Sequence, residues 1–390
     1  MRRTQWRKKH LSVSIIVLIL AAVMVIMVIN SGTDDEEVLH SPLWHQRNLR
    51  DDKLMMETVW RAQGPLQADH PDLLRLLRER YLDRPSTGPP NLVVDRTGSE
   101  AHVYNLYRTN FPSWVRINNL LHTLFSDTPP GFFLEAGALD GEFISNTLYL
   151  EQQLGWTGLL VEADPVLYDA LPGKKRRAWS SHTCLSPAPY PQKLTFESYR
   201  AYQTTSIIHQ LLVRSTGNLA GVSSPAGGRM GVKVREMVQC FPLISYLLAL
   251  NTTTVHYLSL DVEGAEADIL ITLPWEKLDV TVWSIEHRDT NTKFRELYQE
   301  ATEDPLPKNL QEENTKEAHE ENEKPSPHEV VKVRKKVVVY VNAHDPAGGK
   351  DDYFVRFMTE RGYMLYYYWD GDYTFIKKNS SICQRHCPIL

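Results

Sequence analysis

Three carboxylates and three glycines lie in one short segment, GFFLEAGALDGEF. Its apolar beginning predicts a buried strand, and Glu135 lies near the end of that strand. The loop that follows contains Gly137, Asp140, Gly141 and Glu142. Open α/β sheets bind their ligands beyond the carboxyl ends of their strands, so this loop is predicted to lie at a ligand site.

The charge of this loop indicates which kind of ligand it takes. A dinucleotide needs three glycines as G-x-G-x-x-G, with its pyrophosphate against a helix N-terminus. Here the third glycine is absent, and Asp140 and Glu142 would repel a pyrophosphate. S-adenosylmethionine has no phosphate, and nearby carboxylates attract its sulfonium and ammonium groups. A tight strand-to-helix turn with solvated acids is the alternative.

A second acid supports the cofactor interpretation. Glu162 ends the next predicted strand, TGLLVEAD, at the position where an acid accepts hydrogen bonds from ribose hydroxyls. We therefore predict that S-adenosylmethionine is the cofactor. The residues predicted to bind it are Glu135, Gly137, Asp140, Gly141 and Glu162.

Two further segments offer residues for catalysis. In YLSLDVEGAEADIL, Asp261 ends a strand and is predicted to face the pocket. Glu266 lies in the first turn of the next helix, where a negative charge suits the helix dipole and caps the helix. In WSIEHRD, His287 follows Glu286 at a strand end, so Asp261 and His287 are the predicted catalytic residues, with His287 as a general base. A surface histidine is the alternative for His287.

The elements that position these residues alternate between strand and helix. The predicted strands are FFLEAGA, TGLLVEAD, RAWSSHTCLS, KVREMVQC, VHYLSLDVE and VTVWSIEH, and helices such as SNTLYLEQQLG, PVLYDAL, PLISYLLAL and AEADILITL lie between them. KVVVYVNA, a helix in DDYFVRFMTERG and a hairpin in YMLYYYWDGDYTFIKK follow, the hairpin turning at Asp370-Gly371. This order predicts an α/β fold with a mostly parallel sheet, helices on both faces and a terminal antiparallel hairpin.

The N-terminus predicts a membrane anchor. Residues 11–29, LSVSIIVLILAAVMVIMVI, carry no charge, and roughly 20 such residues span a bilayer as a helix. Basic residues precede this run and acidic residues follow it, so the positive-inside rule places residues 1–10 in the cytosol as a basic tail. We predict an uncleaved type II signal anchor at residues 11–30, with the remainder in the lumen of the secretory pathway. A cleaved signal peptide is the alternative, although the run is long and no small-residue cleavage site closes it.

Composition and cysteine spacing bear on possible partners, disulfides and metal binding. The 390 residues carry a formal charge of −5, and this gives no indication of a nucleic-acid partner. Four cysteines in an oxidising lumen allow three disulfide connectivities, of which we favour Cys184–Cys240 with Cys383–Cys387. CQRHC offers ligands to zinc, but no others stand nearby, so no metal site is predicted. Asn251 and Asn379 begin glycosylation sequons.

The remaining segments are accessory. Residues 31–102 are predicted to form a stalk with one amphipathic helix, HPDLLRLLRERYL, which we interpret as a packing element. The α/β domain that contains the predicted cofactor site is expected at residues 103–378, interrupted by a charged, disordered insertion at 301–335. A cysteine-containing tail follows at 379–390.

These motifs resemble the FkbM-type methyltransferases, a class I family that depends on S-adenosylmethionine. The matching pieces are FFLEAGALDGEF, GLLVEADP, VHYLSLDVEGAEADIL, WSIEH and RGYMLYYYWDGDYTFIKK, of which D-V-E-G-x-E is the most specific. They cover about residues 103–290 and 336–378. The resemblance implies a Rossmann-like sheet of seven strands, a donor site on the acids and glycines named above, and Asp261 at the reactive face.

The anchor, the helix before a Pro-Ser segment and the FkbM-like domain also resemble the arthropod Star proteins. That resemblance implies a type II protein of the endoplasmic reticulum, Golgi, endosome or plasma membrane that moves membrane-tethered EGF-family growth-factor precursors. We favour such a trafficking role on a methyltransferase scaffold, because fold does not fix function. The alternative is an active O-methyltransferase acting on a hydroxyl or carboxyl group of a lumenal glycan or protein. The sequence does not identify the cargo, the acceptor or the resident compartment.

Overall fold

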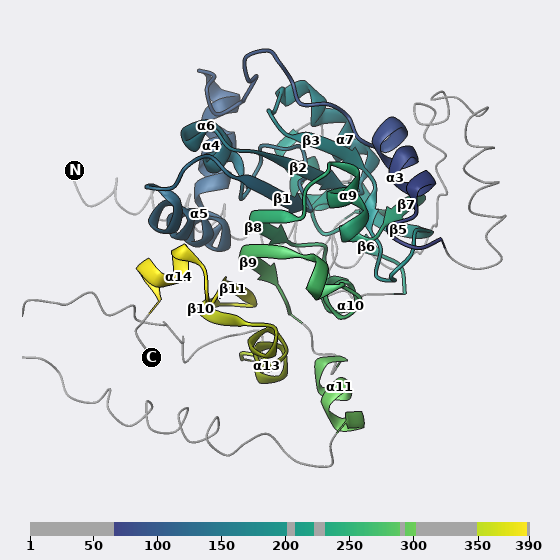
Figure 1. Ribbon diagram of the computed structural model, residues 1–390. Helices are drawn as coiled ribbons and strands as arrows, with labels where there is room; N and C mark the ends of the chain where they lie inside the picture. The colour runs from purple at the N-terminus through teal and green to yellow at the C-terminus, as the bar shows by residue number, and fades with distance from the viewer. Residues whose placement is uncertain (1–65, 201–206, 222–230, 289–292, 302–348, 388–390) are drawn as a thin grey trace, which may run out of the picture.

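A seven-stranded sheet forms the centre of the computed structural model, which describes residues 66–200, 207–221, 231–288, 293–301 and 349–387 (Figure 1). Its strands are β1 (Phe132–Ala136), β2 (Thr157–Glu162), β3 (Trp179–His182), β8 (Thr254–Leu260), β9 (Asp279–Glu286), β10 (Tyr363–Trp369) and β11 (Asp372–Lys377). They lie in the order β10-β11-β9-β8-β1-β2-β3. The strands from β9 to β3 are parallel, and the β10–β11 hairpin joins β9 antiparallel, as the sequence predicts.

Both faces of this sheet are covered, because neighbouring residues of each strand point to opposite sides and both sets are apolar. Leu134 of β1 packs on one face and Phe133 on the other. The first face is covered by α3 (Pro71–Leu76), α9 (Leu243–Ala249), α10 (Glu266–Ile271), α11 (Lys293–Ala301) and α13 (Asp352–Glu360). The second is covered by α5 (Pro112–Phe125), α6 (Leu148–Leu154), α7 (Pro165–Ala170) and α14 (Ser381–His386).

Several helix ends follow directly from their sequences. Helix α6 ends at Gly155, which has φ 68° and lies in the left-handed region that glycine adopts without strain. Helix α7 begins with Pro165 after Asp164, whose side chain accepts hydrogen bonds from two backbone N–H groups of the first turn. Asp351 caps α13 in the same way, which confirms the predicted start of that helix.

A second sheet, which the alternation of the sequence does not reveal, lies beside the first. It contains β4 (Cys184–Leu185), β7 (Val232–Phe241), β5 (Gln192–Arg200) and β6 (Asn218–Leu219), in the order β4-β7-β5-β6. The predicted strand RAWSSHTCLS is therefore divided between the two sheets as β3 and β4. KVREMVQC does not belong to the parallel sheet, because β7 pairs antiparallel with the whole length of β5.

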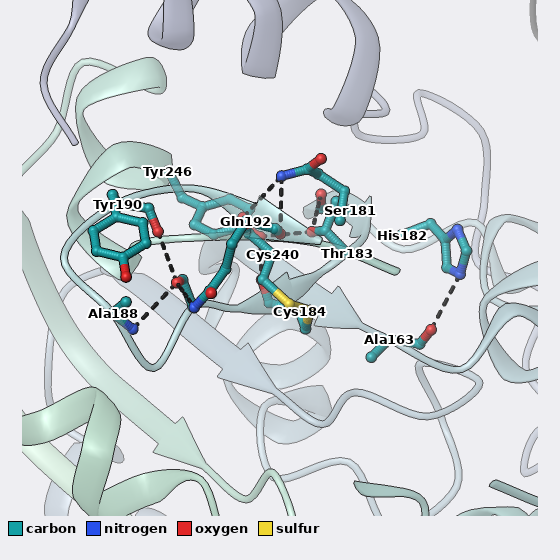
Figure 2. Close-up of a disulfide and its surroundings, with 12 residues drawn as sticks. Ala163, Ser181, His182, Thr183, Cys184, Ala188, Tyr190, Gln192, Cys240 and Tyr246 are labelled. Carbon is teal, nitrogen blue, oxygen red and sulfur yellow. Dashed lines mark hydrogen bonds between the residues drawn. A yellow bond between two sulfur atoms is a disulfide. The ribbon is translucent and has the colours of Figure 1, made fainter. Parts of the chain in front are cut away.

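The predicted disulfide pairing is confirmed. Cys184 and Cys240 are directly paired residues of β4 and β7, and the bond between them fixes this edge of the second sheet (Figure 2). The Tyr246 hydroxyl donates to the Cys184 carbonyl oxygen at 3.0 Å, so helix α9 is tied to the same point. Cys383 and Cys387 are bonded across the short α14.

The segment before the domain packs against it rather than standing apart as a stalk. Helix α3 continues into the π-helical turn η1 (Leu77–Tyr81), and both Leu73 and Leu77 are completely buried in the core of the first face. Further along, the backbone N–H groups of Val93 and Val94 donate to the carboxylate of Glu142. Part of the predicted stalk therefore belongs to the folded domain.

The remaining elements are short or peripheral. They are α4 (Ser99–Thr109), α8 (Ile207–Arg214) and the 3₁₀ turns η2 (Pro172–Lys174) and η3 (Trp275–Lys277). The predicted anchor at 11–30, the insertion at 301–335 and the KVVVYVNA strand lie outside the described residues. Within the described part, no helix combines the length and the apolar character needed to span a bilayer.

Candidate functional site

A cavity of about 310 Å³ lies at the carboxyl ends of the central strands. The ends of β1, β2, β8 and β9 form its floor, which is where open α/β sheets bind ligands. Phe111 and Trp114, before and at the start of α5, line one side, and Phe196 of β5 lines another. The volume falls at the lower end of the range of small-molecule sites.

Among the charged residues of the lining, acidic groups outnumber basic ones. The carboxylates are Glu135, Glu162, Asp261, Glu263, Glu286 and Asp372, and the guanidinium groups are Arg214 and Arg288. Both arginines are engaged with acids: Arg214 pairs with Asp164 at 2.7 Å, and Arg288 pairs with Glu286 at 2.6 Å. The cavity therefore favours a cationic ligand over a pyrophosphate.

Glu135 is held rigidly at the end of β1. It is buried, and its Oε2 accepts hydrogen bonds from the hydroxyls of Ser145 and Thr147, while its Oε1 accepts one from the Asn146 N–H at 2.7 Å. Burial raises the pKa of Glu135, and the Arg176 charge and these hydrogen bonds oppose the rise. The Oδ1 atom of Asn146, which also lines the cavity, is buried and has no hydrogen-bond partner in the described part of the chain. An acceptor is thus left for an N–H group of a ligand.

Glu162 occupies the matching position at the end of β2. It is buried, and its two oxygens accept from the backbone N–H groups of Leu139 at 2.8 Å and Asp164 at 2.7 Å. Burial and the nearby Asp164 charge raise the pKa of Glu162 to about 8. Each oxygen retains a lone pair for a ligand, because a carboxylate oxygen accepts two hydrogen bonds.

The cavity has two halves, one at the ends of β1 and β2 and the other at the ends of β8 and β9, and Gly137 lies where they meet. It has φ 86°, and a Cβ at this position would lie 1.9 Å from the Asp261 carbonyl oxygen. The ends of β1 and β8 therefore approach so closely that only glycine fits.

Asp140 and Gly141, predicted to bind the cofactor, do not line the cavity. The Asp140 carboxylate accepts from the N–H groups of Glu142 and Phe143 and pairs with Lys174 at 2.9 Å. Glu142 pairs with the same lysine at 2.7 Å. These acids hold the turn and the preceding segment together, so the sequence argument from their charge is corrected: other carboxylates supply the negative cavity.

The opposite half of the cavity contains Asp261, as predicted, together with two acids that were not assigned to it. Three carboxylates lie close together, with one oxygen of each within 4.8 Å of the others: those of Asp261, Glu263 and Glu286. Strand β8 ends at Leu260 and Glu263 has φ 59°, so the turn after the strand, rather than the strand itself, positions Glu263. Burial and the Glu286 charge raise the pKa of Asp261 well above its ordinary value.

Glu266 organises this loop rather than facing a ligand. Its Oε1 accepts from the N–H groups of Val262 at 2.8 Å and Gly264 at 3.2 Å. Both N–H groups precede α10, which has no side-chain cap at its N-cap residue Ala265, so the predicted capping of the helix by Glu266 is not what these contacts do.

His287 does not line the cavity, which argues against the predicted general-base role. The ring is buried against Phe294 and Phe354, and its Nε2 lies 3.0 Å from the Asp351 carboxylate. Because β9 ends at Glu286, the next side chain passes to the α13 side of the sheet. His287 therefore connects the sheet to the cap of α13.

Asp372 and Ser284 complete the acidic half, and sequence reasoning missed both. Asp372 is the cross-strand partner of Glu286, and Ser284 lies two residues before Glu286 on β9. Burial and the Glu286 charge raise the pKa of Asp372 to about 7. The Asp370-Gly371 turn fixes the register of β10 and β11 only, so the pairing of β11 with β9 that brings Asp372 opposite Glu286 had no local signal.

Comparison with known families agrees with this geometry. Residues 135–304 match the family model of the methyltransferase FkbM domain. The chain therefore contains an FkbM methyltransferase-like domain, and the mostly parallel seven-stranded sheet fits that class. No curated protein matches the chain.

An FkbM domain implies dependence on S-adenosylmethionine in general, and the residues of this cavity fit that group. Glu162 offers acceptors for ribose hydroxyls, while Glu135 and the free Asn146 oxygen offer negative charge and an acceptor for an ammonium. The lining offers no cluster of basic groups for a phosphate.

Proposed function

We propose that this protein is an S-adenosylmethionine-dependent O-methyltransferase. The observation that carries the proposal is the acid-lined cavity at the carboxyl ends of β1, β2 and β8, within a segment that matches the FkbM domain. When bound, S-adenosylmethionine supplies a methyl group on a positively charged sulfur.

One half of the cavity binds the methyl donor, and the other half binds the acceptor. Glu162 accepts hydrogen bonds from the ribose, and Glu135 with Asn146 attracts the ammonium group. Asp261 lies across Gly137 from this donor half, at the place where an acceptor hydroxyl would approach. The acidic group formed around Asp261 would accept the proton that an acceptor hydroxyl loses when it is methylated. Positioning of the two reactants supplies most of the acceleration.

The test is donor binding to the full chain, measured by isothermal titration calorimetry. We expect one site with a dissociation constant on the order of 1–100 µM, and loss of detectable binding in Glu162→Ala. Glu162→Gln keeps one acceptor oxygen and should bind at least about tenfold more weakly. Glu360→Ala on α13 is the matched control, since Glu360 pairs with Arg356 outside the cavity.

Circular dichroism and thermal melting establish that each variant is folded. Absence of binding to the folded wild-type chain would overturn the proposal. So would equal affinity of the wild type and a folded Glu162→Ala variant.

We infer a second role in secretory-pathway trafficking, of the kind that the Star-like resemblance implies. What supports it is the uncharged run at residues 11–29 between basic and acidic flanks, together with that resemblance. In this proposal the protein is a type II membrane protein whose lumenal domain contacts a membrane-tethered EGF-family precursor. Co-precipitation with such a precursor should persist in Glu162→Ala, and loss of the complex in this folded variant would show that trafficking needs the donor site.

A further inference from the structure

We propose that Asp261, Glu263 and Glu286 form a binding site for a hard divalent cation on the acceptor side of the cavity. The sequence predicts no metal site, because the three acids come from two different strand ends. The fold brings them together where β8 and β9 finish side by side.

The geometry suits an ion rather than a dispersed negative surface. Oxygens bound at 2.3–2.6 Å to one Ca²⁺ lie at most about 5 Å apart, and those of Mg²⁺ lie closer. One oxygen from each of the three carboxylates falls within 4.8 Å of the others. Three carboxylates also match a divalent charge better than a single organic ammonium does.

Two buried polar groups beside the cluster provide an independent indication of a ligand. Ser284 is 4% exposed and Asp372 is 7% exposed, and both line the cavity. Ser284 Oγ and Asp372 Oδ2 are buried, and no hydrogen bond of ordinary geometry reaches either atom within the described residues. The nearest hydroxyl groups are those of Tyr257 beside Ser284 and of Ser113 beside Asp372.

The positions of Ser284 and Asp372 on β9 and β11 place their side chains on the same face as Glu286. Ser284 and Glu286 share a face of β9, and Asp372 lies directly across from Glu286 on β11. Buried polar atoms without partners are rare in native structures. An ion with its bound water would satisfy both.

The chemistry of the ligand set selects the class of ion. All the available groups are oxygens, which suit Mg²⁺, Mn²⁺ or Ca²⁺, whereas zinc and copper favour nitrogen and sulfur ligands. Arg288 already occupies Glu286 Oε1 at 2.6 Å, so the other oxygen of Glu286 is the one available to an ion.

This site narrows the acceptor class, a step that rests on the proposed function. An ion held here would lower the pKa of a coordinated hydroxyl, and its proton would pass to a carboxylate oxygen of the same acidic group that the ion leaves free. The acceptor would carry neighbouring oxygens, as in a diol or a hydroxy acid, because these chelate a hard cation.

The experiment is a titration of the full chain with Mn²⁺, followed by electron paramagnetic resonance without any methyl donor. We expect one Mn²⁺ per chain, with a dissociation constant on the order of 10–100 µM, and competition by Mg²⁺ or Ca²⁺. Glu263→Gln should weaken binding at least about tenfold, and Asp372→Asn should weaken it by a smaller factor.

Asp268→Asn is the matched control, since Asp268 is on the following helix and pairs with Lys293. It should leave Mn²⁺ affinity unchanged. Failure of the wild-type chain to bind Mn²⁺ below about 1 mM would overturn the inference, as would unchanged affinity in both folded variants. Donor binding measured in a chelator is independent of this result, so the two proposals fail separately.

Discussion

The donor half and the acceptor half of the cavity treat their carboxylates in opposite ways. Glu135 and Glu162, at the ends of β1 and β2, are surrounded by N–H and O–H donors from the adjoining loops. Asp261, Glu263 and Glu286, at the ends of β8 and β9, instead face one another across less than 5 Å. Both halves are acidic, but the second places three carboxylates against one another, of which Glu286 also pairs with Arg288.

This difference teaches that negative charge has two uses in one cavity. Compensated carboxylates are fixed in place before a ligand arrives, which preorganises the binding of a ligand with a defined shape. Carboxylates that repel one another instead store unfavourable energy, which a cation or a shared proton relieves. The donor half is therefore a rigid cradle, and the acceptor half is a site that is completed on binding.

The largest predicted effect compares the two halves by stability. Glu135→Gln removes a charge that three hydrogen bonds support, so we expect a loss of about 2 kcal/mol in the free energy of unfolding. Asp261→Asn removes a charge from a repelling group, so we expect a change within about 0.5 kcal/mol or a gain in stability. Urea denaturation of both variants in a chelator measures the difference. Equal losses in the two variants would contradict the contrast between the halves.

A smaller effect sharpens the role of Glu162 through pH. Its pKa of about 8 means that the ionised form, which is the stronger hydrogen-bond acceptor for the ribose, grows as the pH rises from 7 to 9. The ratio of donor dissociation constants for Glu162→Gln and wild type should therefore increase about tenfold over this range. Because titration of the donor is common to both proteins, it cancels in the ratio. A ratio that stays constant with pH would exclude Glu162 as the responsible charge.

Much of the fold is predictable from the sequence, because hydrophobic periodicity and the residues that cap, end or turn an element are local signals. The strands around Glu135 and Glu162, the Gly155 stop, the Asp351 cap and the terminal hairpin all follow from short patterns. The second sheet does not, because the pairing of β5 with β7 is a contact between distant segments that resemble ordinary strands.

The sequence predicts the position of the site and its negative charge, but only some of the residues that line it. A strand end locates Glu135, Glu162 and Asp261 at the cavity. The partner of a charge, however, is not visible in the sequence: Lys174, from a separate turn, draws Asp140 away from the cavity. Likewise β8 ends at Leu260, so the conformation of the following loop, which has no local sequence signal, places Glu263 beside Asp261.

The most direct test of the central claim compares two nucleotide-like ligands on the same chain. The claim is that the acid-lined cavity accepts a cationic nucleoside and rejects a pyrophosphate. Calorimetric titration of the full chain with S-adenosylmethionine and with NAD should give a dissociation constant on the order of 1–100 µM for the first and no binding at about 1 mM for the second. Comparable or tighter binding of NAD would contradict the account.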